Sequence, residues 1–189
     1  MSNGNAAKVR IFVLAALLVS VGACDRRGEP YARYQVDPAR NRAWSLSAEG
    51  LSLHDRSAPG KTVQVPLPGW HWAGPPYGCL PDLALGPKGE AVVTSDILPT
   101  LWRIDPETLA ASVHPLALDA DTDKDVGFSA IAYSSRHGAY YALSQPAGAI
   151  WKIDPLLRRA QKTPLAAPVV KTCGPAVRPP ATFLSLPDL

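Results

Sequence analysis

The chain has 189 residues, of which 47% are hydrophobic and 19% are charged. These values suit one folded domain and exclude a wholly disordered chain. The 19 basic residues exceed the 16 acidic residues by only three, which excludes the broad basic surface that nucleic-acid binding requires. The 20 prolines and 14 glycines predict frequent turns.

The first 23 residues have the features of a secretion leader. Lys8 and Arg10 supply a positive start, and an apolar run follows over residues 11–21, with Ser20 as its one polar residue. This run is too short for a helix to cross about 30 Å of hydrocarbon, and its length is typical of a signal-peptide core. We therefore expect the chain to leave the cytoplasm.

The leader ends at Val21-Gly22-Ala23-Cys24, which resembles the lipobox of bacterial lipoproteins. The resemblance implies cleavage before Cys24 and attachment of palmitate-like acyl chains to that residue. Several acyl chains anchor a protein stably, so the mature chain is expected on a membrane of the bacterial cell envelope, facing the periplasm or the exterior.

The alternatives are an ordinary leader cut near Ala23 and an uncleaved anchor. The sequence does not choose between inner and outer membrane. Residues 24–33 are expected to form a tether.

A six-residue motif recurs at a spacing of about 50 residues. It reads Leu101-Trp102-Arg103-Ile104-Asp105-Pro106, returns over residues 150–155, and has a weaker copy that begins at Leu51. A second motif follows each copy in phase, at residues 63–67, 112–116 and 161–165. Two motifs that keep phase three times indicate an internal repeat.

Each repeat unit is predicted to form four short strands separated by turns. In the first unit, residues 34–67, the strands are expected at 34–36, 43–47, 51–55 and 62–65. In the second unit, residues 81–116, they are expected at 83–85, 91–94, 101–105 and 111–114. In the third unit, residues 128–165, they are expected at 129–133, 139–144, 150–154 and 160–163.

The connector between the first two units, residues 68–80, carries an aromatic cluster. Trp70, His71, Trp72 and Tyr77 lie there among glycines and prolines. Aromatic side chains on a rigid loop bury a large area at little entropic cost, which makes them a candidate binding surface. The alternative is that these side chains fold back and pack on the units.

The second connector, residues 117–127, is acidic. Asp119, Asp121, Asp123 and Asp125 occupy every second position, which resembles the opening of a calcium-binding loop. Lys124 stands where such a loop has glycine, and the closing glutamate is missing. The alternatives are a Ca²⁺ site and a solvated connector; the sequence offers no other cofactor.

Two cysteines remain after Cys24 is assigned to lipidation. In an oxidising compartment, Cys79 and Cys173 are predicted to form a disulfide that closes a loop of about 94 residues. Two unrelated buried thiols are the alternative. Beyond the third unit, residues 181–186 have the pattern of one more strand.

Four antiparallel strands at a period near 50 resemble a blade of a β-propeller. The third-strand motif resembles that of the YVTN-like and NHL-like bacterial propellers, and the resemblance covers about residues 31–165. It implies an all-β domain, with Trp102 and Trp151 packed between blades. Three blades form an incomplete propeller, which residues 181–186 or a second chain could complete. The alternative fold is a β-sandwich.

No pattern in the sequence points to catalytic residues. His54, His71, His114 and His137 are scattered over the repeat, and no nucleophile motif or phosphate-binding loop is found. We therefore expect a membrane-tethered binding or assembly protein with a protein partner or self-association. The alternative is a propeller enzyme of the lactonase or dehydrogenase type, or an inactive shortened relative of one.

Overall fold

The computed structural model of the chain describes residues 32–72, 80–116, 127–144 and 147–166. These residues form twelve strands and one short 3-10 helix, η1 (Pro38–Arg40). The strands are β1 (Ala32–Asp37), β2 (Arg42–Ser47), β3 (Gly50–Asp55), β4 (Thr62–Val65), β5 (Leu83–Leu85), β6 (Ala91–Thr94), β7 (Thr100–Ile104), β8 (Ala111–Pro115), β9 (Ala130–Ser134), β10 (Ala139–Ser144), β11 (Ala149–Ile153) and β12 (Ala160–Pro164). Among these residues no helix is long and apolar enough to cross a membrane.

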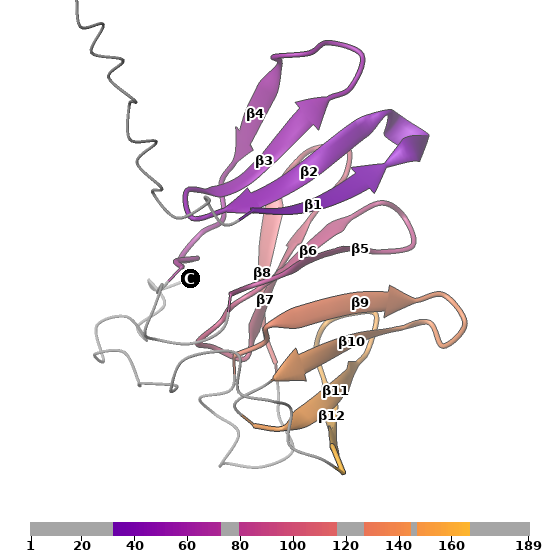
Figure 1. Ribbon diagram of the computed structural model, residues 1–189. Coiled ribbons are helices and arrows are strands. Elements are labelled where there is room, and N and C mark those ends of the chain that lie inside the picture. The colour runs from indigo at the N-terminus through magenta and orange to yellow at the C-terminus, as the bar shows by residue number, and fades with distance from the viewer. Residues whose placement is uncertain (1–31, 73–79, 117–126, 145–146, 167–189) are drawn as a thin grey trace, which may run out of the picture.

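The strands form three separate four-stranded sheets. Each sheet uses four consecutive strands in sequence order, and every neighbouring pair is antiparallel. We name them blade 1 (β1–β4), blade 2 (β5–β8) and blade 3 (β9–β12). They lie one after another as a fan (Figure 1), and the first strands of successive blades are in contact. This arrangement confirms the predicted propeller-like blades and is not the alternative β-sandwich.

Each blade has two faces, and we name them by the neighbour they meet. The N-side face points toward the preceding blade, and the C-side face points toward the following blade. Cross-strand pairs Trp44↔Leu53 and Leu46↔Leu51 place four apolar side chains on the C-side face of blade 1. They share a buried cluster with the N-side face of blade 2. That face contributes Ala91, Val93, Trp102 and Ile104.

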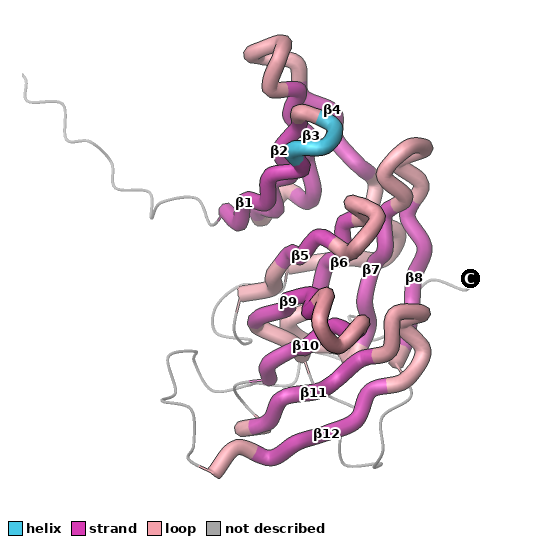
Figure 2. The backbone as a smooth tube through the Cα atoms, turned by 90° about the vertical axis from the view of Figure 1, so that its right-hand side faces the viewer, coloured by secondary structure: helices cyan, strands magenta, loops and turns pink. Residues whose placement is uncertain are grey.

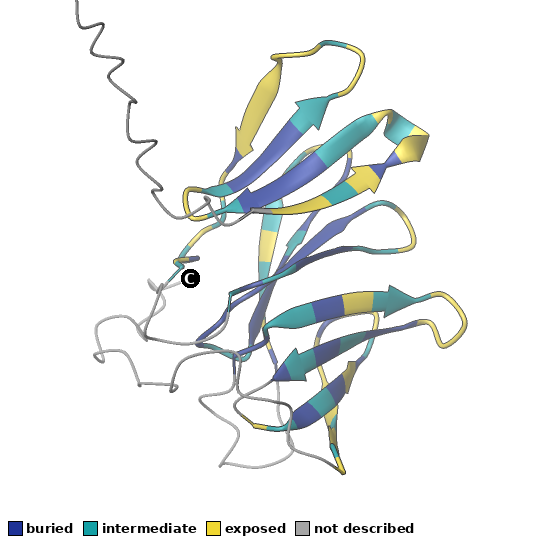
Figure 3. Ribbon diagram, in the orientation of Figure 1, coloured by how far each residue is buried: buried dark blue, intermediate teal, exposed yellow. Residues whose placement is uncertain are grey.

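The second buried cluster lies between blades 2 and 3. Blade 2 contributes Val92 and Leu101 from its C-side face, and blade 3 contributes its N-side face. The N-side side chains of blade 3 on β10 and β11 are Tyr140, Ala142, Trp151 and Ile153. All four residues of β6 are therefore buried, and burial is concentrated between the blades (Figure 3). A strand buried on both faces has an apolar sequence without alternation, as β6 has.

The two repeated tryptophans of the third-strand motif pack between blades. Trp102 and Trp151 are almost completely buried, each on an N-side face. The indole of Trp102 also donates from Nε1 to the carbonyl of Pro68 at 2.7 Å. Burying an indole contributes a large hydrophobic stabilisation, so these residues explain why the motif is repeated.

Candidate functional site

A cleft of about 460 Å³ lies where the β5–β6 turn and the β7–β8 turn of blade 2 meet. It is lined by side chains of mixed charge: Arg40, Lys88, Glu90, Arg103, Asp105, Glu107 and His114, with Pro106, Ala110 and Ser112. A cleft of about 380 Å³ is found at the matching place in blade 3, beside Lys152, Asp154 and Gln161. The two clefts thus follow from the repeat.

The acidic residue that ends each third strand shapes the turn after it. Asp105 Oδ1 accepts hydrogen bonds from the backbone N–H groups of Glu107 at 2.9 Å and Thr108 at 2.8 Å. These backbone donors hold the pKa of Asp105 below its ordinary value. Asp55 and Asp154 accept backbone hydrogen bonds in the same way. The repeated aspartate is therefore a turn residue.

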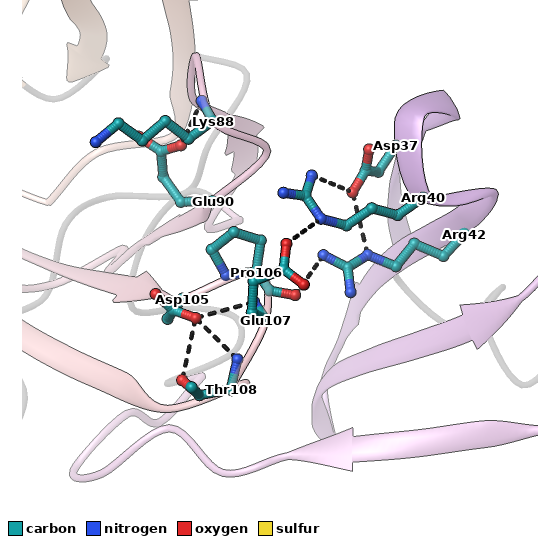
Figure 4. Close-up of polar contacts among 9 residues, drawn as sticks. All are labelled: Asp37, Arg40, Arg42, Lys88, Glu90, Asp105, Pro106, Glu107 and Thr108. Atoms are coloured by element: carbon teal, nitrogen blue, oxygen red, sulfur yellow. Dashed lines mark hydrogen bonds and ion pairs between the residues drawn. The ribbon is translucent and has the colours of Figure 1, made fainter.

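Two arginines of blade 1 bind this turn of blade 2, as Figure 4 shows. Arg40 Nε donates to Glu107 at 2.7 Å, and Arg42 Nη2 donates to the carbonyl of Pro106 at 2.6 Å. Both guanidinium groups also contact Asp37, at 3.3 Å and 3.1 Å, and that carboxylate is only 3% exposed. The paired acids, Glu107 first, raise the pKa of Arg40. These contacts form a polar joint between blades 1 and 2.

Glu90 is the centre of a matching joint between blades 2 and 3. Its carboxylate accepts from Arg103 at 3.3 Å, from the hydroxyl of Tyr140 in blade 3 at 3.2 Å, and from the backbone N–H of Lys88 at 2.8 Å. Burial, followed by the charge of Glu90, strongly raises the pKa of Tyr140. The tyrosine hydroxyl therefore stays protonated and remains a donor.

The joint leaves no room for a side chain at Gly86. A Cβ atom built there would lie 2.1 Å from the hydroxyl of Tyr140. The glycine in this turn is therefore required by close packing.

The cleft also contains a serine–histidine contact on β8. Ser112 Oγ lies 2.8 Å from His114 Nε2 and donates to the carbonyl of Arg103 at 3.2 Å. Partial burial is the main cause that lowers the pKa of His114, and Arg103 adds to it, so the imidazole is neutral at pH 7. Because the single proton of the serine hydroxyl serves the Arg103 carbonyl, this contact orients both side chains and does not activate a nucleophile.

Most charged groups of the cleft are engaged within the protein. All three carboxylates of the cleft and both of its arginines have partners within the protein. The ammonium of Lys88 is used by none of the hydrogen bonds or ion pairs among the described residues, so it is the cation that can meet a ligand. The described residues contain no group of three or more His, Cys, Asp or Glu that could hold a metal ion.

The aromatic connector is divided between core and surface. Trp70 is buried in the cluster between blades 1 and 2, and its Nε1 donates to the carbonyl of Thr94 at 3.0 Å. Trp72 packs partly against the same cluster, and His71 is exposed. Tyr77 lies outside the described residues. The packing interpretation holds for Trp70, whereas a binding role for the exposed part stays a prediction.

The connectors meet the β6–β7 turn at one end of blade 2. Thr94 Oγ1 donates to the carbonyl of Phe128 at 2.8 Å, and the N–H of Phe128 donates to the carbonyl of Ser95. The N–H of Leu116 donates to the carbonyl of Pro99. The described ends of both connectors therefore lie at the end of blade 2 opposite the charged cleft.

Several predicted sites fall outside the described residues. These are the lipidation site Cys24, the disulfide residues Cys79 and Cys173, and the acidic series Asp119, Asp121, Asp123 and Asp125. Three of the four histidines contact a hydroxyl of a nearby residue, namely His54 with Ser45, His114 with Ser112, and His137 with Ser134.

Sequence reasoning missed the residues of the charged cleft. Arg42 and Pro106 are 64 positions apart, and Glu90 and Tyr140 are 50 apart. Charged residues in turns carry no signal of such partners. One signal was available, because Glu90 is the charged residue next to the apolar run of β6, and a carboxylate in that place needs a buried partner.

Comparison with solved structures identifies the architecture. The chain is similar to the dihydro-heme d1 dehydrogenase NirN, solved in complex with DHE, with a TM-score of 0.52 and 16% identity over 74% of this chain. The fold is a β-propeller arc. This chain spans only 29% of the dehydrogenase chain. A virginiamycin B lyase from Staphylococcus aureus, in complex with quinupristin, has a TM-score of 0.40 and 17% identity over 74% of this chain and 40% of the lyase.

No protein-family model matches the sequence, and no curated protein matches it. Likeness at 16% identity shows the shared fold alone.

Proposed function

We propose that this protein is a lipid-anchored binding or assembly scaffold of the bacterial cell envelope and has no catalytic activity of its own. The observation that carries this proposal is the use of charge in the cleft. The carboxylates of Glu90 and Glu107 and the guanidinium groups of Arg40 and Arg103 bind partners within the protein. Groups used in this way stabilise a rigid surface and are not available to a substrate.

The anchor half of the proposal rests on the lipobox at Val21-Gly22-Ala23-Cys24. In a bacterial host fed an alkyne fatty acid, the full chain should incorporate the label and sediment with membranes. Cys24→Ala should lose both properties, because the acylated thiol is removed. Cys79→Ala is the matched control and should keep both. Label that persists in Cys24→Ala would contradict lipidation at this residue.

The scaffold half rests on the exposed end of the aromatic connector. A photo-crosslinking residue at His71 should give a discrete adduct with an envelope protein, because His71 is exposed and the neighbouring Trp72 is only partly buried. The matched control is the same residue at Ser57, which is exposed in the β3–β4 turn at the opposite end of blade 1. Equal adducts at both positions, or none at His71, would argue against a partner at this surface.

A further inference from the structure

The outer face of the first blade is more polar than the outer face of the last blade. The N-side faces of blades 2 and 3 are apolar, and each is covered by the blade before it. The cross-strand pairs Ala43↔His54 and Ser45↔Ser52 form the matching face of blade 1. Ser52 is therefore at the position in blade 1 that corresponds to Trp102 in blade 2, and His54 is at the position that corresponds to Ile104.

The polar side chains on the N-side face of blade 1 form hydrogen bonds with one another. Ser45 Oγ lies 2.7 Å from His54 Nε2, and His54 Nδ1 lies 3.0 Å from Thr62 Oγ1. A face of this kind caps an array, as terminal repeats do. Its two central strands lack the apolar side chains that the N-side faces of blades 2 and 3 present, whereas β1 keeps Tyr34, 67% exposed, and Val36, 50% exposed, on the same face.

The C-side face of blade 3 has kept the apolar pattern. Tyr141, Leu143 and Ile150 stand where blade 2 has Val92, Thr94 and Leu101. All three blade 2 residues are fully buried by blade 3, whereas all three blade 3 residues are partly exposed. The lower blade in Figure 2, β9–β12, is the last described unit of the fan. An apolar sheet face at the end of a repeat array needs a cover.

The spacing of the repeat units indicates which segment of the chain packs on the C-side face of blade 3. The first strands of the three blades begin at Ala32, Leu83 and Ala130, so the next one is due about 50 residues later. Residues 181–186, Ala-Thr-Phe-Leu-Ser-Leu, lie at that distance. Between blades, each new first strand contacts the first strand of the preceding blade.

We propose that residues 181–186 lie against the C-side face of blade 3, beside β9, as the first strand of a fourth repeat unit. The occupant is this segment of the same chain. It has the apolar side chains to cover Leu143 and Ile150, and about as many residues separate it from β12 as separate β4 from β5. A second copy of the chain is the other occupant, and the concentration dependence of protection described below distinguishes the two.

Chymotrypsin cleavage after Phe183 tests this placement in the full chain. A strand held on the sheet is cut only after it opens. Cleavage at Phe183 should therefore be at least about tenfold slower than in a synthetic peptide of residues 175–189. Leu143→Lys should remove most of this protection. Gln64→Lys, a change at an exposed position on the N-side face of blade 1, should leave the protection unchanged.

A second variant tests the proposal even if Leu143→Lys fails to fold. Leu186→Asp leaves blade 3 intact and should also abolish protection, judged against a peptide with the same change. The proposal is overturned if the wild-type chain and the peptide are cut at the same rate. It is equally overturned if protection rises with protein concentration, because the cover would then come from a second copy.

Discussion

At the scale of the residue, the repeated motif is explained by what each side chain contacts. The tryptophan packs on the preceding blade, and the aspartate accepts backbone hydrogen bonds from the turn that follows. The two tryptophans differ in one respect. The indole N–H of Trp102 has an acceptor, the carbonyl of Pro68, whereas that of Trp151 is buried without a partner.

This difference predicts unequal costs for the same substitution. Trp102→Phe loses a hydrogen bond and leaves the Pro68 carbonyl without its donor, whereas Trp151→Phe removes an unsatisfied polar group. The loss in free energy of unfolding should be larger for Trp102→Phe by about 1–2 kcal/mol. Urea unfolding of both variants measures the difference. Equal losses would show that the Trp102 hydrogen bond adds nothing to stability.

His114 predicts a pH dependence. Its pKa is lowered in the folded state, mainly by burial. The unfolded chain therefore binds the proton more readily, and stability is present above the unfolded pKa of about 6.5 and lost as the pH falls below it. The difference in free energy of unfolding between pH 7 and pH 5 should be smaller in His114→Gln than in the wild type. The same loss in both proteins would assign the acid sensitivity to other groups.

At the scale of the element, neighbouring blades are joined by apolar clusters and by polar contacts at the turns. Arg42 links the β1–β2 region to the β7–β8 turn and also contacts the buried carboxylate of Asp37. The backbone of the second connector packs closely on the β6–β7 turn. A Cβ atom on Gly127 would lie 2.0 Å from the carbonyl oxygen of Asp96.

The joint between blades 1 and 2 should be sensitive to Arg42. Arg42→Gln leaves the carboxylate of Asp37 with a weaker partner in a buried position, so it should cost about 2–3 kcal/mol of unfolding free energy. Arg40→Gln is the control and should cost less, because its shortest contact is with Glu107, which is 70% exposed, and its contact with Asp37 at 3.3 Å is longer than that of Arg42 at 3.1 Å. Denaturant unfolding compares the two. A larger effect for Arg40→Gln would contradict this account.

Gly127 should be intolerant of any side chain. Gly127→Ala forces the connector away from the β6–β7 turn, and overpacking of this kind costs about 1–3 kcal/mol. Gly138→Ala is the control, since a Cβ atom there meets nothing within 4 Å and only the positive φ of 57° is unfavourable. Thermal unfolding should therefore rank Gly127→Ala as the less stable variant. The reverse order would mean that the connector yields without cost.

At the scale of the whole molecule, the outer faces of the first and last blades differ. On the N-side face of blade 1, Ser45, Ser52 and His54 replace the apolar residues of the other blades, whereas the C-side face of blade 3 is apolar. A head-to-tail contact between two copies would therefore set the apolar C-side face of blade 3 against a face whose central strands are polar and whose exposed apolar residues, Tyr34 and Val36, lie on β1. Any protein partner is expected at the connector end of the blades.

Light scattering of the unlipidated chain from residue 25 checks this expectation. We expect a monomer, since residues 181–186 of the same chain are proposed to cover the C-side face of blade 3, and Ser45, Ser52 and His54 are a poor match for that face of another copy. A stable dimer that Gln64→Lys disrupts would contradict this account, because it would place the N-side face of blade 1 in an interface.

The sequence predicted the elements closely. Each of the twelve strands is present within one or two residues of its expected bounds, because alternation, Gly and Pro turns and the final aspartate are signals carried within a few residues. The repeat also predicted that Trp102 and Trp151 would pack. The sequence alone left Trp70 undecided between binding and packing, since a connector shows no periodicity.

What the sequence determined by itself is the number, order and type of the strands and their grouping in units of about 50 residues; the leader and its lipid anchor stay predictions. Only the tertiary structure decided which face of each blade meets which neighbour, how Arg42 reaches Pro106 and Tyr140 reaches Glu90, and which end of the fan is polar. The physical reason is range. Strand signals act between adjacent residues, whereas contacts between blades join residues about 50 or more positions apart and depend on packing that no local pattern encodes.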